Sequence, residues 1–290
     1  MPQNIPPLGA PPLHRQFPQM DRVVHRREGW AAMIAMSSSR IATYESIRSE
    51  NLHGWHTGDG MLYLYTADLR QFGENHWATL DPHRLPGTTV DVQLPRADGS
   101  GEGYLPPVDW VGGACLTEPY GVAGMQLNAW GSTLSAKKSW FLFDNEVVCL
   151  GSGITATDGR PIETVVENRR LAAYGDNPLL VNGAPRPGSP GLGEVLPGVS
   201  WAALAGNVPG AEIGYVFPQP TTLSVQREIR AGSPSDINTP YGDPTRVESP
   251  YLTLSIDHGL SPSNATYAYV LLPGFRATDV ARYAASPQVV

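Results

Sequence analysis

Lysine is almost absent from this 290-residue chain: Lys137 and Lys138 are its only two, and charged residues of all kinds make up just 16%. The formal net charge is −7. Nucleic-acid binding requires a basic footprint that neutralises phosphates, so this balance excludes a general nucleic-acid-binding protein. It also repels acidic polymers at long range, so an anionic ligand would need a local cluster of arginines.

Cysteine is nearly as rare, with Cys115 and Cys149 alone. Their number and spacing match neither a metal site nor a disulfide framework. Both lie in apolar, strand-like runs, which favours two buried free thiols. The sequence leaves open whether the two pair with each other.

Long apolar runs are also missing. A membrane-spanning helix needs about 20 consecutive apolar residues, and no stretch approaches this, so we expect no membrane partner. Residues 1–20 lack the apolar segment of a signal peptide. If the chain is the complete product, this pattern predicts a cytoplasmic protein.

Glycine and proline are abundant instead, with 31 and 28 residues beside 41% hydrophobics. Residues that terminate strands at such density are typical of a turn-rich all-β protein. Residues 1–19 are Pro-rich and aperiodic, which indicates an extended lead-in. From residue 20 to 290, short apolar runs alternate with turn clusters without a repeat or a long linker, so we expect one domain of many antiparallel strands.

Two kinds of strand pattern occur in this domain. Residues 223–229 and 251–256 alternate and should each bury one face. Residues 61–65, 140–143 and 267–272 are apolar on both faces, which predicts stacked sheets. A hairpin around Asn145 and a short C-terminal helix over residues 278–285, capped by Thr278, complete the prediction.

Three segments carry a family resemblance. They are Ser37-Ser-Ser-Arg-Ile-Ala-Thr-Tyr-Glu-Ser-Ile-Arg-Ser-Glu-Asn-Leu-His-Gly-Trp55, Arg84-Leu-Pro-Gly-Thr-Thr-Val-Asp91 and Lys137-Lys-Ser-Trp-Phe-Leu-Phe-Asp-Asn-Glu-Val-Val-Cys-Leu-Gly-Ser-Gly-Ile154. In this order they resemble the central β domain of polysaccharide lyase family 8, which includes hyaluronate, chondroitin AC and xanthan lyases. The resemblance covers roughly residues 14–287. It implies a large multi-sheet antiparallel β-sandwich, the super-sandwich, with a short C-terminal helix.

The resemblance implies β-elimination of a uronic-acid polysaccharide. A base removes the proton next to a carboxylate, an acid protonates the leaving oxygen, and donors stabilise the dianion that develops. In this family an N-terminal α/α-toroid domain supplies the catalytic Tyr, His and Asn, and none of these matches a residue here. We therefore expect the isolated chain to be inactive or weak, with acidic polysaccharide and a separate toroid domain or subunit as partners. By resemblance the enzyme is an extracellular carbon–oxygen lyase, and whether this chain alone is an enzyme stays open.

The resemblance places the cleft wall at residues 44–55. Glu45 takes the supporting catalytic role, and the substrate-binding residues are Arg48, Glu50, Asn51 and Trp55. Relatives often carry Asn at position 48, and a guanidinium there could bind a carboxylate bidentately. The alternative is that Glu45, Arg48 and Glu50 form a solvated ladder of ion pairs.

Other polar residues have structural expectations. Arg84 and Asp91 bracket a Pro-Gly turn and should lock it as an ion pair. No cofactor is expected; Asp81 and Asp91 hint at calcium, but that ion needs about six to eight oxygens. Most tryptophans should lie in the core. Weak candidates for anion contacts are Arg169, Arg170, Arg227 and Arg230.

Two alternatives to the lyase reading stay open. One is a non-catalytic carbohydrate-binding or structural β module. The other is an independent enzyme, such as a glycosidase built on paired carboxylates. The sequence decides neither which polysaccharide is bound nor the oligomeric state.

Overall fold

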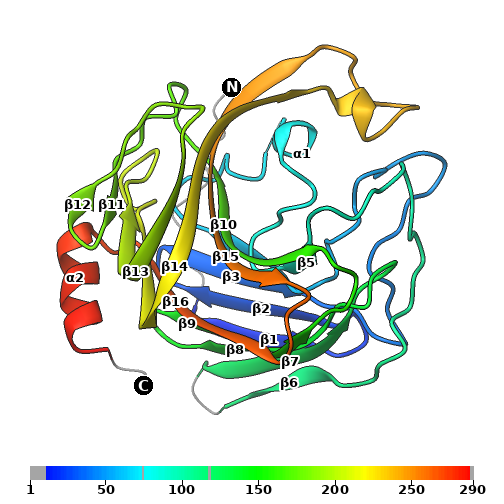
Figure 1. Ribbon diagram of the computed structural model, residues 1–290, viewed down its shortest axis with the longest axis horizontal. Helices are drawn as coiled ribbons and strands as arrows, with labels where there is room; N and C mark the ends of the chain where they lie inside the picture. The colour runs from blue at the N-terminus through cyan, green and yellow to red at the C-terminus, as the bar shows by residue number, and fades with distance from the viewer. Residues whose placement is uncertain (1–10, 74, 117–118, 288–290) are drawn as a thin grey trace.

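The computed structural model describes residues 11–73, 75–116 and 119–287 and consists mainly of two antiparallel sheets (Figure 1). The first sheet has the order β1-β2-β3-β4. Its strands are β1 (Leu13–Phe17), β2 (Arg22–Arg27), β3 (Trp30–Ala35) and β4 (Met61–Tyr65). Strand β1 therefore lies inside the segment 1–19 that we expected as a lead-in, and it pairs with β2 in continuous register from Leu13 opposite Arg26 to Phe17 opposite Arg22.

The second sheet runs in the order β12-β11-β13-β14-β16-β9-β8-β7-β6, and β14 also pairs with β15, which leads on to β10 and β5. Its strands are β5 (Thr89–Asp91), β6 (Val111–Cys115), β7 (Gly121–Asn128), β8 (Ser135–Leu142), β9 (Val147–Thr155), β10 (Pro161–Arg170), β11 (Leu179–Val181), β12 (Ala184–Pro185), β13 (Gly193–Leu204), β14 (Ile213–Gly232), β15 (Val247–Leu260) and β16 (Ala265–Pro273). The long strands β14 and β15 continue beyond the body of the sheet toward the 3-10 turn at Pro234–Asp236 (Figure 1). The expected all-β multi-sheet sandwich is confirmed.

The main core lies between the two sheets. Strand β7 alternates strictly, burying Gly121, Ala123, Met125 and Leu127 on the side of the first sheet, while the residues between them are half-buried. Val23 and Ile34 from the first sheet meet this face. Burial of such side chains contributes about 1.5–3 kcal/mol each, so the stacking of sheets that the two-faced apolar strands predicted is the dominant stabilising feature.

The outer face of the second sheet is covered at one end by helix α2 (Ala277–Ala285), at the lower left of Figure 1. Val280 is fully buried there against Val216 and Leu272. The short C-terminal helix is confirmed, but its N-cap is Arg276, which makes no side-chain cap, so the expected capping by Thr278 is wrong. Within the described residues, no helix has the length and apolarity needed to cross a membrane.

Strand β15 departs from the one-faced burial that its alternation predicted. All residues from Tyr251 to Ile256 are buried. The second face is covered by the segment around α1 (His76–Thr79), where the hydroxyls of Tyr251 and Thr79 are 2.9 Å apart. A loop that folds back over a sheet leaves no trace in the pattern of the strand it covers, and small polar residues such as Thr253 and Ser255 are buried beneath it.

The hairpin around Asn145 is confirmed, since β8 and β9 pair from Leu142 opposite Val147 onward. The two cysteines are free. Cys149 is buried as expected, but Cys115 is exposed, because β6 forms the edge of the sheet. An apolar run at an edge strand does not ensure burial.

A chain of imidazoles joins the two sheets. His14 and His25 are buried with their Nδ1 atoms 3.2 Å apart, and His25 Nε2 lies 2.8 Å from the carbonyl of Phe143. That carbonyl accepts only from an N–H, so His25 is protonated on Nε2 and its Nδ1 accepts from His14. Gln16 then donates to His14 Nε2 at 2.9 Å and to the Val122 carbonyl at 3.1 Å. The relay is fully satisfied only when both rings are neutral.

Candidate functional site

A cleft of about 450 Å³ opens where the first sheet meets the loops that follow it. Its floor includes Arg22 from β2 and Tyr63 from β4. Its walls come from Glu50 and Asn51 on one side and from Trp77 of α1 on another, with Asn238 beyond the end of β14. The cleft therefore combines aromatic rings, amides, a carboxylate and a guanidinium, which is a lining suited to a polar ligand with apolar faces.

The loop at residues 48–51 has an unusual backbone. Arg48, Ser49 and Asn51 all have positive φ, at 51°, 65° and 54°. Non-glycine residues rarely adopt this region, and each such residue adds strain of order 1 kcal/mol or more. Three in four residues mark a conformation that the surroundings impose.

Several hydrogen bonds impose it. Asn51 Nδ2 donates to the carbonyl of Glu45 at 2.8 Å, and Ser46 Oγ donates to the carbonyl of Glu50 at 2.6 Å. From the other side, the N–H of Thr239 donates to Ser49 at 3.1 Å, and the Leu52 N–H donates to the Ile237 carbonyl at 2.9 Å. The loop is thus tied to the chain beyond β14, which holds Glu50 and Asn51 at the cleft.

The expected site residues separate into three positions. Glu50 and Asn51 line the cleft, as the sequence led us to expect. Glu45 and Arg48 are exposed beside it, outside its lining. No ion pair joins Glu45, Arg48 and Glu50, all of which are described, so the alternative ladder is absent. The Arg48 guanidinium is left without a partner in the described part of the chain.

Trp55 lies below the cleft surface. Only 6% of it is exposed, and the rings of His53 and His83 pack against its indole with centroids 4.8 and 4.9 Å away. This burial does not fit the sugar contact we expected of Trp55. Trp77 is 37% exposed and lines the cleft, so it offers the aromatic surface instead. Nothing in the sequence around Trp77 distinguishes it from a core tryptophan.

Arg22 is the cleft residue that the sequence did not reveal. Its Nη1 donates to the carbonyls of Met20, Asp21 and Met36, at 2.9, 3.2 and 2.6 Å. Its Nε and Nη2 have no partner among the described residues. Burial lowers the pKa of Arg22 from its ordinary value, but a guanidinium remains charged at neutral pH. The bonds at Nη1 hold the Arg22 guanidinium in place, and the N–H groups of Nε and Nη2 remain free at the floor of the cleft.

The floor provides no general base. Burial raises the pKa of Tyr63 to about 12, so its hydroxyl stays protonated at neutral pH and can donate but not remove a proton. His53 at the rim pairs with Asp98 through its Nε2 at 3.0 Å. Of the cleft residues, the carboxylate of Glu50 and the imidazole of His53 lie at the walls and rim, and the floor itself offers hydrogen-bond donors for binding.

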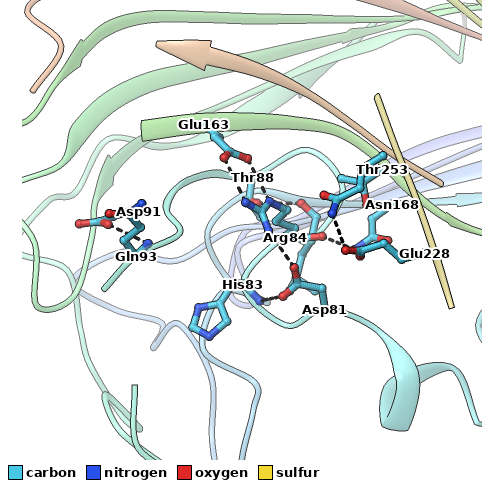
Figure 2. A network of polar contacts seen from close by, with 12 residues as sticks. Asp81, His83, Arg84, Thr88, Asp91, Gln93, Glu163, Asn168, Glu228 and Thr253 are labelled. Atoms are coloured by element: carbon cyan, nitrogen blue, oxygen red, sulfur yellow. Dashed lines mark hydrogen bonds and ion pairs between the residues drawn. The ribbon is translucent and has the colours of Figure 1, made fainter. Parts of the chain in front are cut away.

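Arg84 and Asp91 do not pair with each other, contrary to our expectation. Figure 2 shows the Arg84 guanidinium between Glu163 and Asp81, with Asp91 apart from it. Arg84 contacts the two oxygens of Glu163 at 3.0 and 3.1 Å, which raises its pKa. Asp91 is buried and bonds Arg160 at 2.6 Å. Arg84 is thus tied to β10 and to Asp81, and Asp91 to the loop before β10, so three ion pairs stabilise the turn in place of the one that we expected.

The acidic residues we considered for calcium are engaged by these arginines. Asp81 also accepts from the N–H of His83 at 2.9 Å (Figure 2). Across the described residues, no group of three or more His, Cys, Asp or Glu side chains could hold a metal ion.

Three of the four arginines weighed for anion contacts serve the fold. Arg169 pairs with buried Glu167 at 3.0 Å, and Arg227 donates to the carbonyls of Gly175 and Asn177. Arg230 bonds Asn168 and Glu228, each at 2.8 Å. Charges that are neutralised inside the structure are poor candidates for ligand contacts.

Comparison with known proteins gives this geometry a context. Residues 12–284 match the family model described as polysaccharide lyase family 8, super-sandwich domain. The chain is 48% identical to a xanthan lyase of Bacillus sp. (strain GL1), over 99% of this chain and 30% of the relative. It is 43% identical to a hyaluronate lyase of Thermasporomyces composti, over 97% of this chain and 36% of that protein.

Comparison with solved structures points to the same family. The structure of a Paenibacillus xanthan lyase matches with a TM-score of 0.92 at 48% identity, over 97% of this chain and 27% of that one. A Streptomyces coelicolor chondroitin AC lyase in complex with chondroitin sulphate matches with a TM-score of 0.80 at 41% identity, over 96% and 35%. The chain thus spans about a third of the length of these relatives. It belongs to polysaccharide lyase family 8, whose super-sandwich domain it forms over residues 12–284.

Proposed function

We propose that this chain forms one wall of a cleft in which uronic-acid-containing polysaccharide is cleaved by β-elimination, and that an α/α-toroid domain supplies the catalytic Tyr, His and Asn. The observation that carries the proposal is the cleft itself, where Asn51, Trp77 and Arg22 converge from three separate parts of the chain. The relatives are named as xanthan, hyaluronate and chondroitin AC lyases, which supports an acidic polysaccharide as the ligand and a site outside the cell.

Each cleft residue makes a different kind of contact with the polysaccharide, according to its side chain. Trp77 packs against the apolar face of a sugar ring. Arg22 offers free N–H groups to a uronate carboxylate, which withdraws charge as the neighbouring proton leaves. Asn51 and Glu50 hydrogen-bond sugar hydroxyls from a loop whose backbone is already fixed. Glu45, exposed beside the cleft, orients catalytic groups of the facing domain.

The test uses this chain fused to the α/α-toroid domain of a xanthan or hyaluronate lyase. Release of unsaturated uronate is followed by ultraviolet absorbance for the parent fusion and for Trp77→Ala, Arg22→Gln and Glu45→Gln. We expect kcat/KM to fall roughly tenfold or more in each variant, since each loses a contact made to substrate or catalytic groups. Arg282→Gln, on helix α2 and outside the cleft lining, is the control and leaves kcat/KM unchanged. Unchanged rates in all three cleft variants would reject the proposed wall.

A second candidate is a carbohydrate-binding module without turnover, and the absence of a general base at the cleft floor favours it. In that case the parent fusion binds oligosaccharide through Trp77 but releases no unsaturated product on any of the three polymers. The same assay therefore separates the two functions.

A further inference from the structure

The two lysines of the chain are adjacent on β8 and point to opposite sides of the sheet. Lys138 is fully buried, and its ammonium donates to the carbonyls of Gly87 and Asp59. Lys137 is exposed on the outer face and forms no ion pair with any described residue. In a chain with a net charge of −7, this leaves one uncompensated cation on a sheet surface that the cleft does not use.

That surface is hollowed. Two grooves of about 550 and 380 Å³ lie on it and share Ser139. Ser139 is paired with Gly124 on one side and with Leu150 on the other, and Leu150 is paired with Ala268. The grooves therefore follow one row across four neighbouring strands, made of Gly124, Ser139 and Ala268 with the partly exposed Leu150 between them, and Lys137 and Ser152 lie in the adjacent row.

Trp110 closes the β7 end of this row and is 54% exposed. Its ring rests on Gly124, where an added Cβ would lie 2.9 Å from the indole Cη2. The backbone at Gln126 donates to the Trp110 carbonyl at 2.8 Å, which fixes the residue against β7. The glycine is required at this position because any side chain would displace the indole. An aromatic ring is thus held over the sheet with much of its surface open to solvent.

The geometry points to a second saccharide-binding surface, separate from the cleft, that takes a short segment of acidic glycan along the grooves. Trp110 packs on a pyranose face, Lys137 pairs with a carboxylate or sulfate of the glycan, and Ser139, Ser152 and Thr266 hydrogen-bond hydroxyl groups. The carboxylate of Asp109, at the Trp110 end, accepts from Ser39 Oγ and so is not left facing the ligand unpaired.

A glycan fits this surface better than a peptide. Strands β7, β8 and β9 have neighbours on both sides, and β16 pairs with β9 along its length but with β14 only over Val270–Pro273. An added strand, which is how extended peptides bind sheets, therefore finds no free backbone along the row through Ser139 and could pair only at the β14-facing edge of β16. The groove runs across the strands and offers side-chain hydroxyls, one cation and one ring. Those groups match the hydroxyls, anionic group and apolar ring faces of a uronate sugar.

The test is an amide-resolved NMR titration of the 290-residue chain with a uronate-containing hexasaccharide, and with a neutral hexasaccharide for comparison. We expect saturable shifts at the amides of Gly124, Ser139 and Ser152 that are stronger with the acidic probe. Trp110→Ala should weaken this binding about tenfold, as loss of an aromatic anchor does. Lys137→Gln should weaken it about threefold and remove most of its salt dependence.

Two controls keep the result specific. Trp77→Ala, in the cleft, leaves the shifts at Gly124 and Ser139 unchanged, so failure of the cleft proposal and failure of this one are distinguishable. Trp110→Phe retains a ring and should recover much of the affinity lost in Trp110→Ala. The inference is overturned if the outer-face amides do not shift, if Trp110→Ala binds as the parent does, or if the same amides shift only with protein concentration, which would assign the surface to a second copy of the chain.

Discussion

Asn51 donates from its side-chain Nδ2 to the backbone carbonyl of Glu45 at a distance of 2.8 Å. The bond spans the loop that carries Arg48 and Glu50, and it closes on a residue whose own φ is 54°. One side chain thus fixes the backbone that faces the cleft and at the same time lines the cleft. The residue that we propose to contact sugar therefore also sets the loop geometry.

Replacing Asn51 separates the two effects. Asn51→Ala loses the bond to Glu45 and places a β-carbon at positive φ without the local polar contact, so we expect the free energy of unfolding to fall by about 1–2 kcal/mol. Asn51→Gly loses the same bond but adopts positive φ freely, and should be about 1 kcal/mol more stable than the alanine variant. Urea unfolding of both measures this. Equal stability of the two variants would mean that the backbone strain at residue 51 is negligible.

We expect the free energy of unfolding to fall in acid, because protonation of His14 and His25 disrupts the contact between the two sheets. Burial and the Arg27 cation lower the pKa of His14 to about 4, and burial lowers that of His25 to about 4 despite the Phe143 carbonyl and nearby Asp144. The unfolded chain binds these protons near pH 6.5, so between pH 6.5 and 4 the unfolded state carries more protons than the folded state. Stability is therefore fully present above pH 6.5 and is lost as the pH falls toward 4.

The expected slope is up to about 1.4 kcal/mol per pH unit for each imidazole. Urea unfolding at pH 4.5, 5.5, 6.5 and 7.5 measures it. His14→Gln/His25→Gln should show a shallower slope than the parent, while buried His76 and half-buried His258, whose pKa values desolvation lowers to about 3 and about 4, keep it from vanishing. A parent chain equally stable at pH 4.5 and 7.5 would contradict the neutral relay.

Arg84 and Glu163 should couple measurably. Their bidentate contact is partly buried, at 3.0 and 3.1 Å, and such a pair exceeds an exposed one in strength. A double-mutant cycle with Arg84→Met and Glu163→Gln should return a coupling energy of about 1 kcal/mol or more. The exposed pair Arg282 and Asp279, at 3.3 Å, is the comparison and should return close to zero. A larger coupling energy for Arg282 and Asp279 than for Arg84 and Glu163 would contradict the role of the Arg84–Glu163 contact (Figure 2) in stabilising the turn.

Substitutions of Arg48 test whether the exposed rim of the cleft contacts the substrate. Its guanidinium is exposed and unpaired within the described residues, so we expect Arg48→Ala to weaken uronate oligosaccharide binding at the cleft by a few-fold at low salt and less at high salt. Arg48→Asn should retain sugar contact with a lower salt dependence. Shifts at the amides of Glu50 and Asn51, followed by NMR at two salt concentrations, report this site alone. Identical titrations for parent and both variants would leave Arg48 without a role in binding.

Strand periodicity and the three family segments were sufficient to predict the sandwich, because alternation reports directly which side of a strand is buried. Periodicity failed at Tyr251–Ile256, where the α1 segment covers a second face. That contact joins residues more than 170 positions apart, and no local pattern encodes it.

A motif in the sequence marked only part of the lining of the candidate cleft. Glu50 and Asn51 lie in such a motif and do line the cleft. Arg22 reaches the cleft floor because β2 stands beside β3 in the first sheet, and Trp77 reaches the wall because α1 folds over β15. Tertiary packing alone determines both positions, and it also buries Trp55, which the motif singled out.

We propose that this chain forms one side of a two-domain cleft. Turnover of hyaluronan, chondroitin and xanthan by the isolated chain, compared with the same chain fused to a family α/α-toroid domain, tests it most directly. We predict no unsaturated uronate from the isolated chain or the isolated toroid and rapid release from the fusion, since removing members of a catalytic group costs several orders of magnitude in rate. Turnover by the isolated chain at the rate of the fusion would contradict the claim.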